Sequence, residues 1–82
     1  MMNVNVLLFA QAKQIAGTDS VEVSVESGCT VAELKDSLSQ TVPGLRDLLK
    51  RSNIAIDQQY SVDTDVVTDG AEVAMIPPVS GG

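Results

Sequence analysis

The chain has 82 residues, 44% of them hydrophobic, so its length allows one domain with a modest apolar core and its composition argues against disorder. Five basic and eleven acidic residues give a formal net charge of −6, which argues against binding to nucleic acid or to an anionic membrane surface. The single cysteine allows no internal disulfide, and no apolar run is long enough to span a bilayer, so we expect a cytoplasmic protein.

The first part of the chain predicts two strands. Residues 2–9 begin half-polar and become fully apolar, a pattern typical of a central strand. Residues 11–20 are expected to form a connection, with Gly17 and Asp19 as turn residues. Residues 21–26 alternate strictly between apolar and polar side chains, which predicts a second strand with one wet face. The two strands are candidates for an antiparallel hairpin.

A capping box marks the start of the main helix. The Thr30 hydroxyl is expected to accept from the Glu33 N–H, while the Glu33 carboxylate reaches back to the cap. Cys29 and Leu34 have the spacing of a hydrophobic staple, so the Cys29 side chain is expected to point inward. The helix should run over residues 31–40, because a proline follows closely and the residue before a proline avoids the helical region.

The remaining chain predicts a short helix and further strands. Residues 43–51 place leucines on one helical face and basic side chains late, which suits the helix dipole. Residues 54–56 predict a short strand, and a short edge strand or a loop is expected around 60–62. A turn at 68–71 leads into the last strand, residues 72–76, which ends at two prolines that cannot donate to a sheet.

These elements together predict an α+β fold. The first and last strands are strongly apolar, so they are best placed side by side and parallel at the centre of a mixed sheet. One main helix then packs across one face, accompanied by a short second helix, which is the β-grasp, or ubiquitin-like, layout. We expect residues 1–76 to form this domain and residues 77–82 to form an extended C-terminal tail.

Few side chains offer catalytic chemistry. The chain has no histidine, which excludes Ser-His and Cys-His nucleophile pairs, and with one cysteine no metal site is expected. Asp63, Asp65 and Asp69 lack the spacing of a calcium-binding loop, so we interpret them as a solvated acidic loop. Cys29 lies near a helix N-terminus that would stabilise a thiolate, but its staple position favours a packed side chain over a reactive thiol.

The C-terminal segment is the candidate functional element, Pro77-Pro78-Val79-Ser80-Gly81-Gly82. It carries no charged side chain and leaves directly from a strand expected at the centre of the sheet. Gly81 and Gly82 lack side chains, so they suit a narrow channel in another protein. The reactive group is the Gly82 carboxylate, a poor electrophile that needs an activating partner using ATP. A frayed and functionless terminus is the alternative.

Three segments resemble the family of small, sulfur-carrier subunits of molybdopterin synthase: Leu7-Leu8-Phe9-Ala10-Gln11, Thr68-Asp69-Gly70-Ala71-Glu72-Val73-Ala74 and the terminal Pro77-Pro78-Val79-Ser80-Gly81-Gly82. The resemblance covers essentially the whole chain, and its ending is the most specific part. It implies that an E1-like adenylyltransferase uses ATP to adenylate Gly82, and that sulfur then replaces the adenylate to leave a thiocarboxylate. It implies no bound cofactor.

The same resemblance implies a partner and a reaction. The tail, with Pro77, Pro78, Val79, Ser80 and Gly81, would enter the active site of the large subunit of molybdopterin synthase. There Gly82 would donate sulfur to cyclic pyranopterin monophosphate, and two deliveries would make the molybdopterin dithiolene of the molybdenum cofactor. The chain would be the sulfur-donor subunit of a sulfurtransferase, with the catalytic side chains in the large subunit. The family assembly is a heterotetramer.

The resemblance also implies a docking surface near the tail, with Phe9, Tyr60 and Ile76 at the partner interface. Strand alternation leaves open whether Phe9 and Ile76 are core residues instead. Three other functions remain as alternatives. A thiamine-type sulfur carrier would supply a thiazole, a ubiquitin-like protein modifier would pass Gly82 to a lysine, and a plain interaction domain would have an inert tail.

Overall fold

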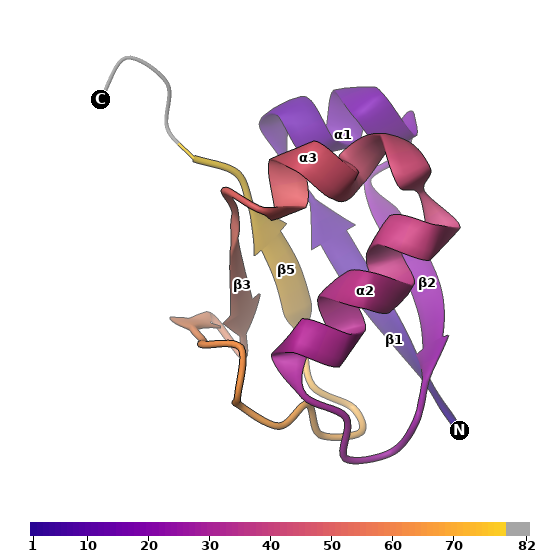
Figure 1. Ribbon diagram of the computed structural model, residues 1–82, viewed down its shortest axis with the longest axis vertical. Coiled ribbons are helices and arrows are strands. Elements are labelled where there is room, and N and C mark those ends of the chain that lie inside the picture. Colours follow the sequence, from indigo (N-terminus) through magenta and orange to yellow (C-terminus); the bar gives the residue numbers. More distant parts are fainter. Residues whose placement is uncertain (79–82) are drawn as a thin grey trace.

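The computed structural model describes residues 1–78, and they form a five-stranded mixed sheet with α2 lying across one face (Figure 1). The elements in chain order are β1 (Met2–Leu8), α1 (Ala10–Ala16), β2 (Ser20–Val25), α2 (Val31–Thr41), the 3-10 turn η1 (Pro43–Leu45), α3 (Arg46–Leu49), β3 (Asn53–Ile56), β4 (Gln59–Tyr60) and β5 (Val73–Ile76). This is the expected β-grasp fold.

The sheet has the strand order β2-β1-β5-β3-β4. The first and last strands are neighbours and run parallel, with Val6 opposite Val73 and Leu8 opposite Met75. The hairpin of β1 and β2 and the pairing of β3 with β5 are antiparallel. The prediction that β1 and β5 lie side by side in the interior of the sheet is therefore confirmed. Both strands thus have hydrogen-bonded neighbours on either side, and each presents apolar side chains to the core.

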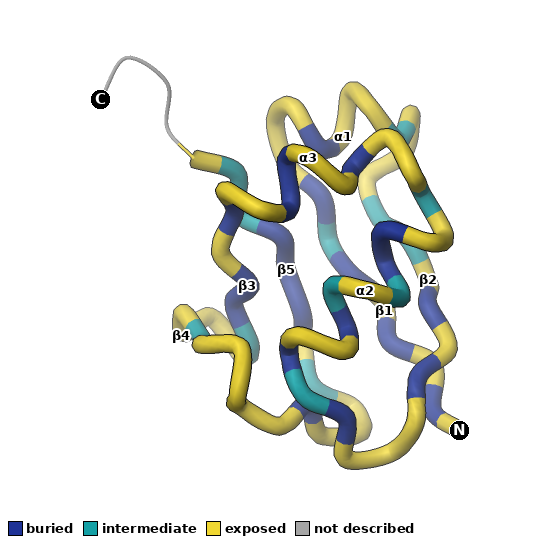
Figure 2. Tube along the Cα trace, in the orientation of Figure 1, coloured by how far each residue is buried: buried dark blue, intermediate teal, exposed yellow. Residues whose placement is uncertain are grey.

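The hydrophobic core lies between the sheet and α2. Alternate residues of β1 point into it: Val4, Val6 and Leu8 are at most 5% exposed, and Figure 2 shows β1 alternating along its length. Leu34 and Leu38, one helical turn apart on α2, are fully buried against them. The spacing of four residues on the helix and two on the strand thus brings both apolar faces together.

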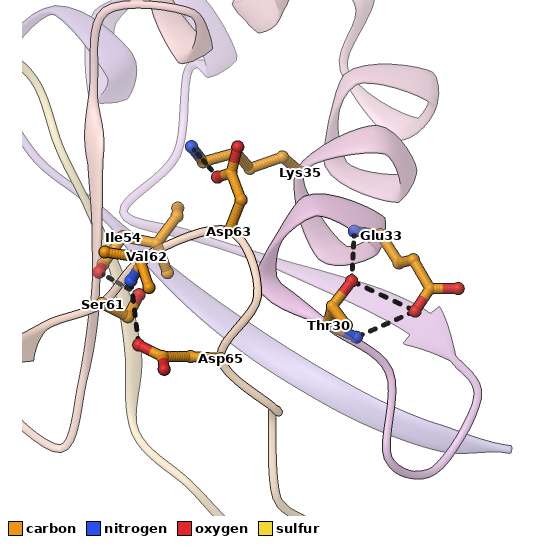
Figure 3. Close-up of polar contacts among 8 residues, drawn as sticks. All are labelled: Thr30, Glu33, Lys35, Ile54, Ser61, Val62, Asp63 and Asp65. Carbon is orange, nitrogen blue, oxygen red and sulfur yellow. Dashed lines mark hydrogen bonds and ion pairs between the residues drawn. The ribbon is translucent and has the colours of Figure 1, made fainter.

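The start of α2 has the predicted capping box (Figure 3). The Thr30 hydroxyl accepts from the Glu33 N–H at 3.3 Å, and the Thr30 N–H donates to Glu33 Oε1 at 2.9 Å. Cys29 and Leu34 are both buried in the core, as the staple spacing predicts. Two donors that would be unsatisfied at a bare helix end are satisfied here.

The connection expected over residues 11–20 contains a helix that the sequence interpretation did not predict, α1 (Ala10–Ala16). Its residues are mostly good helix formers, but no side chain caps its N-terminus and only Ala12 is buried, so neither the capping nor the periodicity signal was present. The turn residue Gly17 was correctly identified: it ends α1 in the left-handed conformation, at φ 74°.

The short edge strand begins one residue earlier than expected, at Gln59 rather than Tyr60. Asp57 and Gln58 both have positive φ, 50° and 69°, which is the requirement of a tight two-residue hairpin turn. That turn fixes the pairing of Ile56 with Gln59 and of Ala55 with Tyr60. The following residues pack as a loop rather than continuing the strand.

The loop after β4 is held by its own polar side chains (Figure 3). The Ser61 hydroxyl donates to the Ile54 carbonyl at 2.6 Å, and the Val62 N–H donates to Asp65 Oδ2 at 2.9 Å. Lys35 Nζ on α2 pairs with Asp63 Oδ1 at 2.9 Å. Asp63 and Asp65 thus act as local structural anchors at the surface of this loop.

Candidate functional site

The root of the C-terminal tail is an interior strand. β5 is paired with β1 on one side and with β3 on the other, where Ile76 lies opposite Asn53. Ile76 and Pro77 are half-buried and Pro78 is exposed, so the chain leaves the fold within two residues of the strand. Figure 1 shows the C-terminal end of β5 close to the turn that follows α3. The predicted site residues Val79, Ser80, Gly81 and Gly82 lie outside the described residues.

The sheet has a second face, opposite α2, which we call the open face. Because Val6 and Leu8 point to the core, Leu7 points to the open face, and residues opposite each other in register share a face. Leu7 lies opposite Ala74, Ala74 opposite Ala55, and Ala55 opposite Tyr60. One row of apolar side chains therefore crosses four strands on this face.

The next position along the strands adds Phe9 and Ile76. Phe9 keeps an extended backbone, φ −131° and ψ 155°, so the alternation of β1 continues through it and its side chain also lies on the open face. Leu8 is opposite Met75, which brings Phe9 level with Ile76. We call Leu7, Phe9, Ala55, Tyr60, Ala74 and Ile76 the apolar patch.

The backbone just after Phe9 turns sharply. Ala10 has φ 50°, an uncommon conformation for a residue with a side chain, and α1 begins there. The Phe9 carbonyl accepts from the Ala12 N–H at 3.0 Å, and the Leu8 N–H donates to the Asp19 carbonyl at 2.8 Å. These contacts hold the Phe9 backbone in place at the end of the sheet from which the tail leaves.

Exposure separates the large side chains of the apolar patch from the core. Phe9 is 48% exposed and Tyr60 is 70% exposed, and both belong to a contiguous set of apolar side chains on one face of the sheet. Ile76 is half-buried and is not among the residues packed on the core. The open alternative for Phe9 and Ile76 is thereby resolved: they are not core residues. Their role in binding a partner stays a prediction.

The sequence interpretation missed three members of the apolar patch, Leu7, Ala55 and Ala74. Ala55 and Ala74 are buried, yet they lie outside the core cluster because they face away from α2. The sequence of β1 contained this information: side chains alternate between the two faces of a strand, so with Val4 and Val6 pointing inward Leu7 must point outward. Every residue of β5 is apolar, so the face to which each side chain points could be assigned only from the register of β5 with β1.

The other half of the open face is polar. Asn3 and Asn5 of β1 lie opposite Ser24 and Glu22 of β2, and the Ser24 hydroxyl donates to Asn3 Oδ1 at 2.8 Å. The open face is therefore divided between a polar half at the start of β1 and the apolar patch at the end from which the tail leaves.

The folded domain offers little reactive chemistry. Cys29 is 6% exposed, and burial, reinforced by the Glu33 carboxylate, raises the pKa of its thiol, which disfavours the nucleophilic thiolate. A hydrogen bond and ion pair with Asp19 raise the pKa of the Lys13 amino group, so it stays charged and is not a base. Within residues 1–78 no three metal-binding side chains come together. The C-terminal carboxylate of Gly82 remains the candidate reactive group.

No helix in residues 1–78 combines the length and apolar character needed to cross a membrane.

Comparisons with known proteins match almost the whole chain. Residues 6–82 match the model of the ThiS family. The molybdopterin synthase sulfur carrier subunit of Mycobacterium tuberculosis (strain ATCC 25618 / H37Rv) is 41% identical over 83 residues, covering 100% of both chains. The human protein of the same name is 34% identical, covering 100% of this chain and 97% of its own. The crystal structure of SAMP1 from Haloferax volcanii has a TM-score of 0.87 at 27% identity, covering 98% of this chain and 99% of that one.

Proposed function

This chain belongs to the ThiS family, and from that premise we propose that it is the sulfur-carrier subunit of molybdopterin synthase. In this proposal the C-terminal Gly82 carries sulfur as a thiocarboxylate and donates it to cyclic pyranopterin monophosphate. The product is the dithiolene of molybdopterin, the organic part of the molybdenum cofactor.

One observation carries the proposal. The chain aligns along its full length with the sulfur carrier subunit of M. tuberculosis. The structure is consistent with this match, because the tail leaves directly from the interior strand β5. A tail rooted in an interior strand has a fixed origin, so docking of the folded domain determines where the tail begins. The two final glycines then need only a narrow path to reach a buried active site.

The first step of the proposed mechanism is activation of Gly82. An E1-like adenylyltransferase joins the Gly82 carboxylate to the AMP part of ATP, and pyrophosphate leaves. A sulfur donor then displaces AMP, so the carbon–oxygen bond to the adenylate breaks and a carbon–sulfur bond forms. ATP is consumed by the activating enzyme, and this chain holds no cofactor of its own.

The second step is transfer in the large subunit of molybdopterin synthase. The tail residues Pro77, Pro78, Val79, Ser80 and Gly81 lead Gly82 into that active site. The catalytic side chains belong to the large subunit. This assignment is supported by the absence of histidine here and by the burial of Cys29, which raises the pKa of its thiol. Two such transfers complete one dithiolene, and the assembly is a heterotetramer.

The apolar patch is the proposed docking surface for the large subunit. Phe9, Tyr60 and Ile76 lie at or near the end of the sheet from which the tail departs, and Phe9 and Tyr60 expose much of their surface. Aromatic side chains dominate the energetics of many interfaces, because they bury a large area with few rotatable bonds. Docking through this patch would place the large subunit over the root of the tail.

A second candidate function has one observation in its favour. SAMP1 is a small archaeal modifier protein, and its fold matches this one closely. A modifier would use the same adenylated Gly82 but would transfer it to a lysine of another protein, forming an isopeptide. A thiamine-type sulfur carrier, which would use the same thiocarboxylate, is the third candidate.

Reconstitution separates the three candidates. The thiocarboxylated chain is mixed with the large subunit and cyclic pyranopterin monophosphate, and molybdopterin is measured. The proposal expects stoichiometric sulfur transfer, which is lost when Gly82 is deleted while the thermal unfolding of the domain is unchanged. Formation of lysine conjugates, or sulfur transfer to a thiazole precursor but not to the pyranopterin, would contradict it.

A further inference from the structure

A short stretch after α2 is the one basic region of this acidic chain. Residues 46–51 hold three of the five basic residues of the chain and one of its eleven acidic residues. We call Arg46, Lys50 and Arg51 the basic ridge. All three side chains are exposed, while Leu48 and Leu49 between them are buried and anchor α3 on the core.

The basic ridge lies beside the root of the tail. The turn after α3 leads into Asn53, the first residue of β3, and Asn53 is paired with Ile76, the last residue of β5. Arg51 is therefore two residues from a strand position that directly adjoins the tail's root. Figure 1 shows α3 and this turn next to the point where the chain leaves β5.

The turn that carries the ridge is fixed in place. The Arg51 N–H donates to the Leu48 carbonyl at 3.1 Å, and the Ser52 hydroxyl, which is buried, donates to the same carbonyl at 2.7 Å. The Ser52 N–H donates to the Leu49 carbonyl at 3.2 Å. The backbone under Lys50 and Arg51 is thus held by three hydrogen bonds, so the segment that carries these charges has a defined position beside the root of the tail.

These charges are also little used within the fold. Lys13 and Lys35 each form a close ion pair, at 2.8 Å with Asp19 and 2.9 Å with Asp63. In the ridge the corresponding contact is Lys50 with Asp47 at 4.0 Å, and both side chains are largely exposed. Among residues 1–78, Arg46 and Arg51 form no ion pair.

Most acidic side chains lie at the opposite end of the sheet. That end contains the start of β5, the turn between β3 and β4, and the loops on either side of the bridge between Thr30 and Val66. Its acidic residues are Glu26, Glu33, Asp57, Asp65, Asp69 and Glu72. Two further acidic residues, Asp36 and Asp63, instead line a shallow pocket together with Arg46 and Lys50. The domain therefore has a negative end and, at the end that presents the tail, a positive ridge.

We propose that the basic ridge docks against an acidic surface on the large subunit, beside the entrance that receives the tail. This inference rests on the proposed function. An acidic surface repels a chain of net charge −6 unless the chain approaches ridge first, so the charge distribution selects the orientation in which the tail leads. The apolar patch supplies most of the contact area, while the basic ridge orients the domain as it approaches and raises the rate of association.

The test compares two double variants with the same net charge. Lys50→Ala/Arg51→Ala removes two charges from the ridge, and Thr64→Glu/Thr68→Glu adds two negative charges at the opposite end, so each lowers the net charge from −6 to −8. All four side chains are exposed, so we expect both variants to unfold at nearly the wild-type temperature. Association with the large subunit is measured by stopped-flow fluorescence at about 0.05 M and about 0.3 M salt.

The ridge variant should associate about tenfold more slowly at low salt, with its dissociation rate nearly unchanged, and high salt should reduce the difference. The control should stay within about twofold of wild type. Equal slowing of both variants would show that total charge matters rather than the ridge, and faster association of both would show a basic partner surface; either overturns the inference. If the wild-type chain binds no large subunit, the proposed function fails as well.

Discussion

Leu8, the last residue of β1, and Phe9, which follows it, should separate folding from docking. Leu8 is 2% exposed and belongs to the core, whereas Phe9 is 48% exposed and belongs to the apolar patch. Fully burying such a side chain is worth about 1.5–3 kcal/mol, so folding uses about half of this for Phe9 and leaves roughly 1 kcal/mol for a partner. Truncation of each residue to alanine should therefore affect different measurements.

Phe9→Ala should lower the free energy of unfolding by about 1 kcal/mol and weaken binding to the large subunit by about fivefold. Leu8→Ala should lower the free energy of unfolding by about 2–5 kcal/mol, because it leaves a cavity in the core. Urea titration and isothermal calorimetry measure the two quantities. A loss of stability in Phe9→Ala equal to that in Leu8→Ala would refute the assignment of Phe9 to the surface. Unchanged binding would refute its role in docking.

Three further predictions concern the fold. Thr30→Ala should destabilise the domain by about 1 kcal/mol through loss of the cap on α2, whereas Thr30→Ser should restore most of it; equal urea midpoints for the two would contradict this. Gln58→Gly should stabilise the domain by about 0.5 kcal/mol, because relief of the left-handed strain at φ 69° outweighs the extra entropy of the unfolded chain. Burial raises the pKa of the Cys29 thiol, so its contribution to stability is fully present below the ordinary thiol value of 9.0 and is lost as pH rises above it. The thermal midpoint should therefore drop more steeply with pH in this range than it does in Cys29→Ala. Parallel slopes for the two proteins would argue against a buried thiol.

The core of the fold was predictable because several local signals agreed. The capping box at Thr30 and Glu33, the staple at Cys29 and the alternation of residues 21–26 each specify one conformation, and the structure contains all of them. The apolar character of the first and last strands was enough to place β1 beside β5. The conformation of such segments can be predicted from sequence because their local preferences agree with the burial that the fold requires.

Helix α1 shows what the sequence did not reveal. Ala10–Ala16 buries one side chain, lacks a capping side chain and starts from a residue at φ 50°, so its existence depends on how the chain leaves β1 and rejoins the hairpin. Gly17 was recognised from the sequence as a turn residue, and it ends α1, but no residue predicted where α1 begins. Short helices of this kind are stabilised mainly by tertiary packing, which a local pattern does not contain.

The candidate site was only half predictable. The tail stood out because it ends in two glycines and the chain has no histidine and only one cysteine. The apolar patch, by contrast, required strand register. Phe9, Tyr60 and Ile76 were proposed from a resemblance, and their placement away from the core follows from pairings such as Leu7 with Ala74. The basic ridge was visible as charged residues at the end of a helix, and only the pairing of Asn53 with Ile76 put it beside the tail.

The central claim is that sulfur is carried on Gly82 by a folded domain that is itself unreactive. The most direct measurement is intact and fragment mass spectrometry of the chain after incubation with the E1-like enzyme, ATP and a sulfur donor. We predict a mass increase equal to the exchange of one oxygen for one sulfur, localised to Gly82 and absent when Gly82 is deleted. A carboxylate that stays unmodified, or sulfur found on Cys29 instead, would contradict the account.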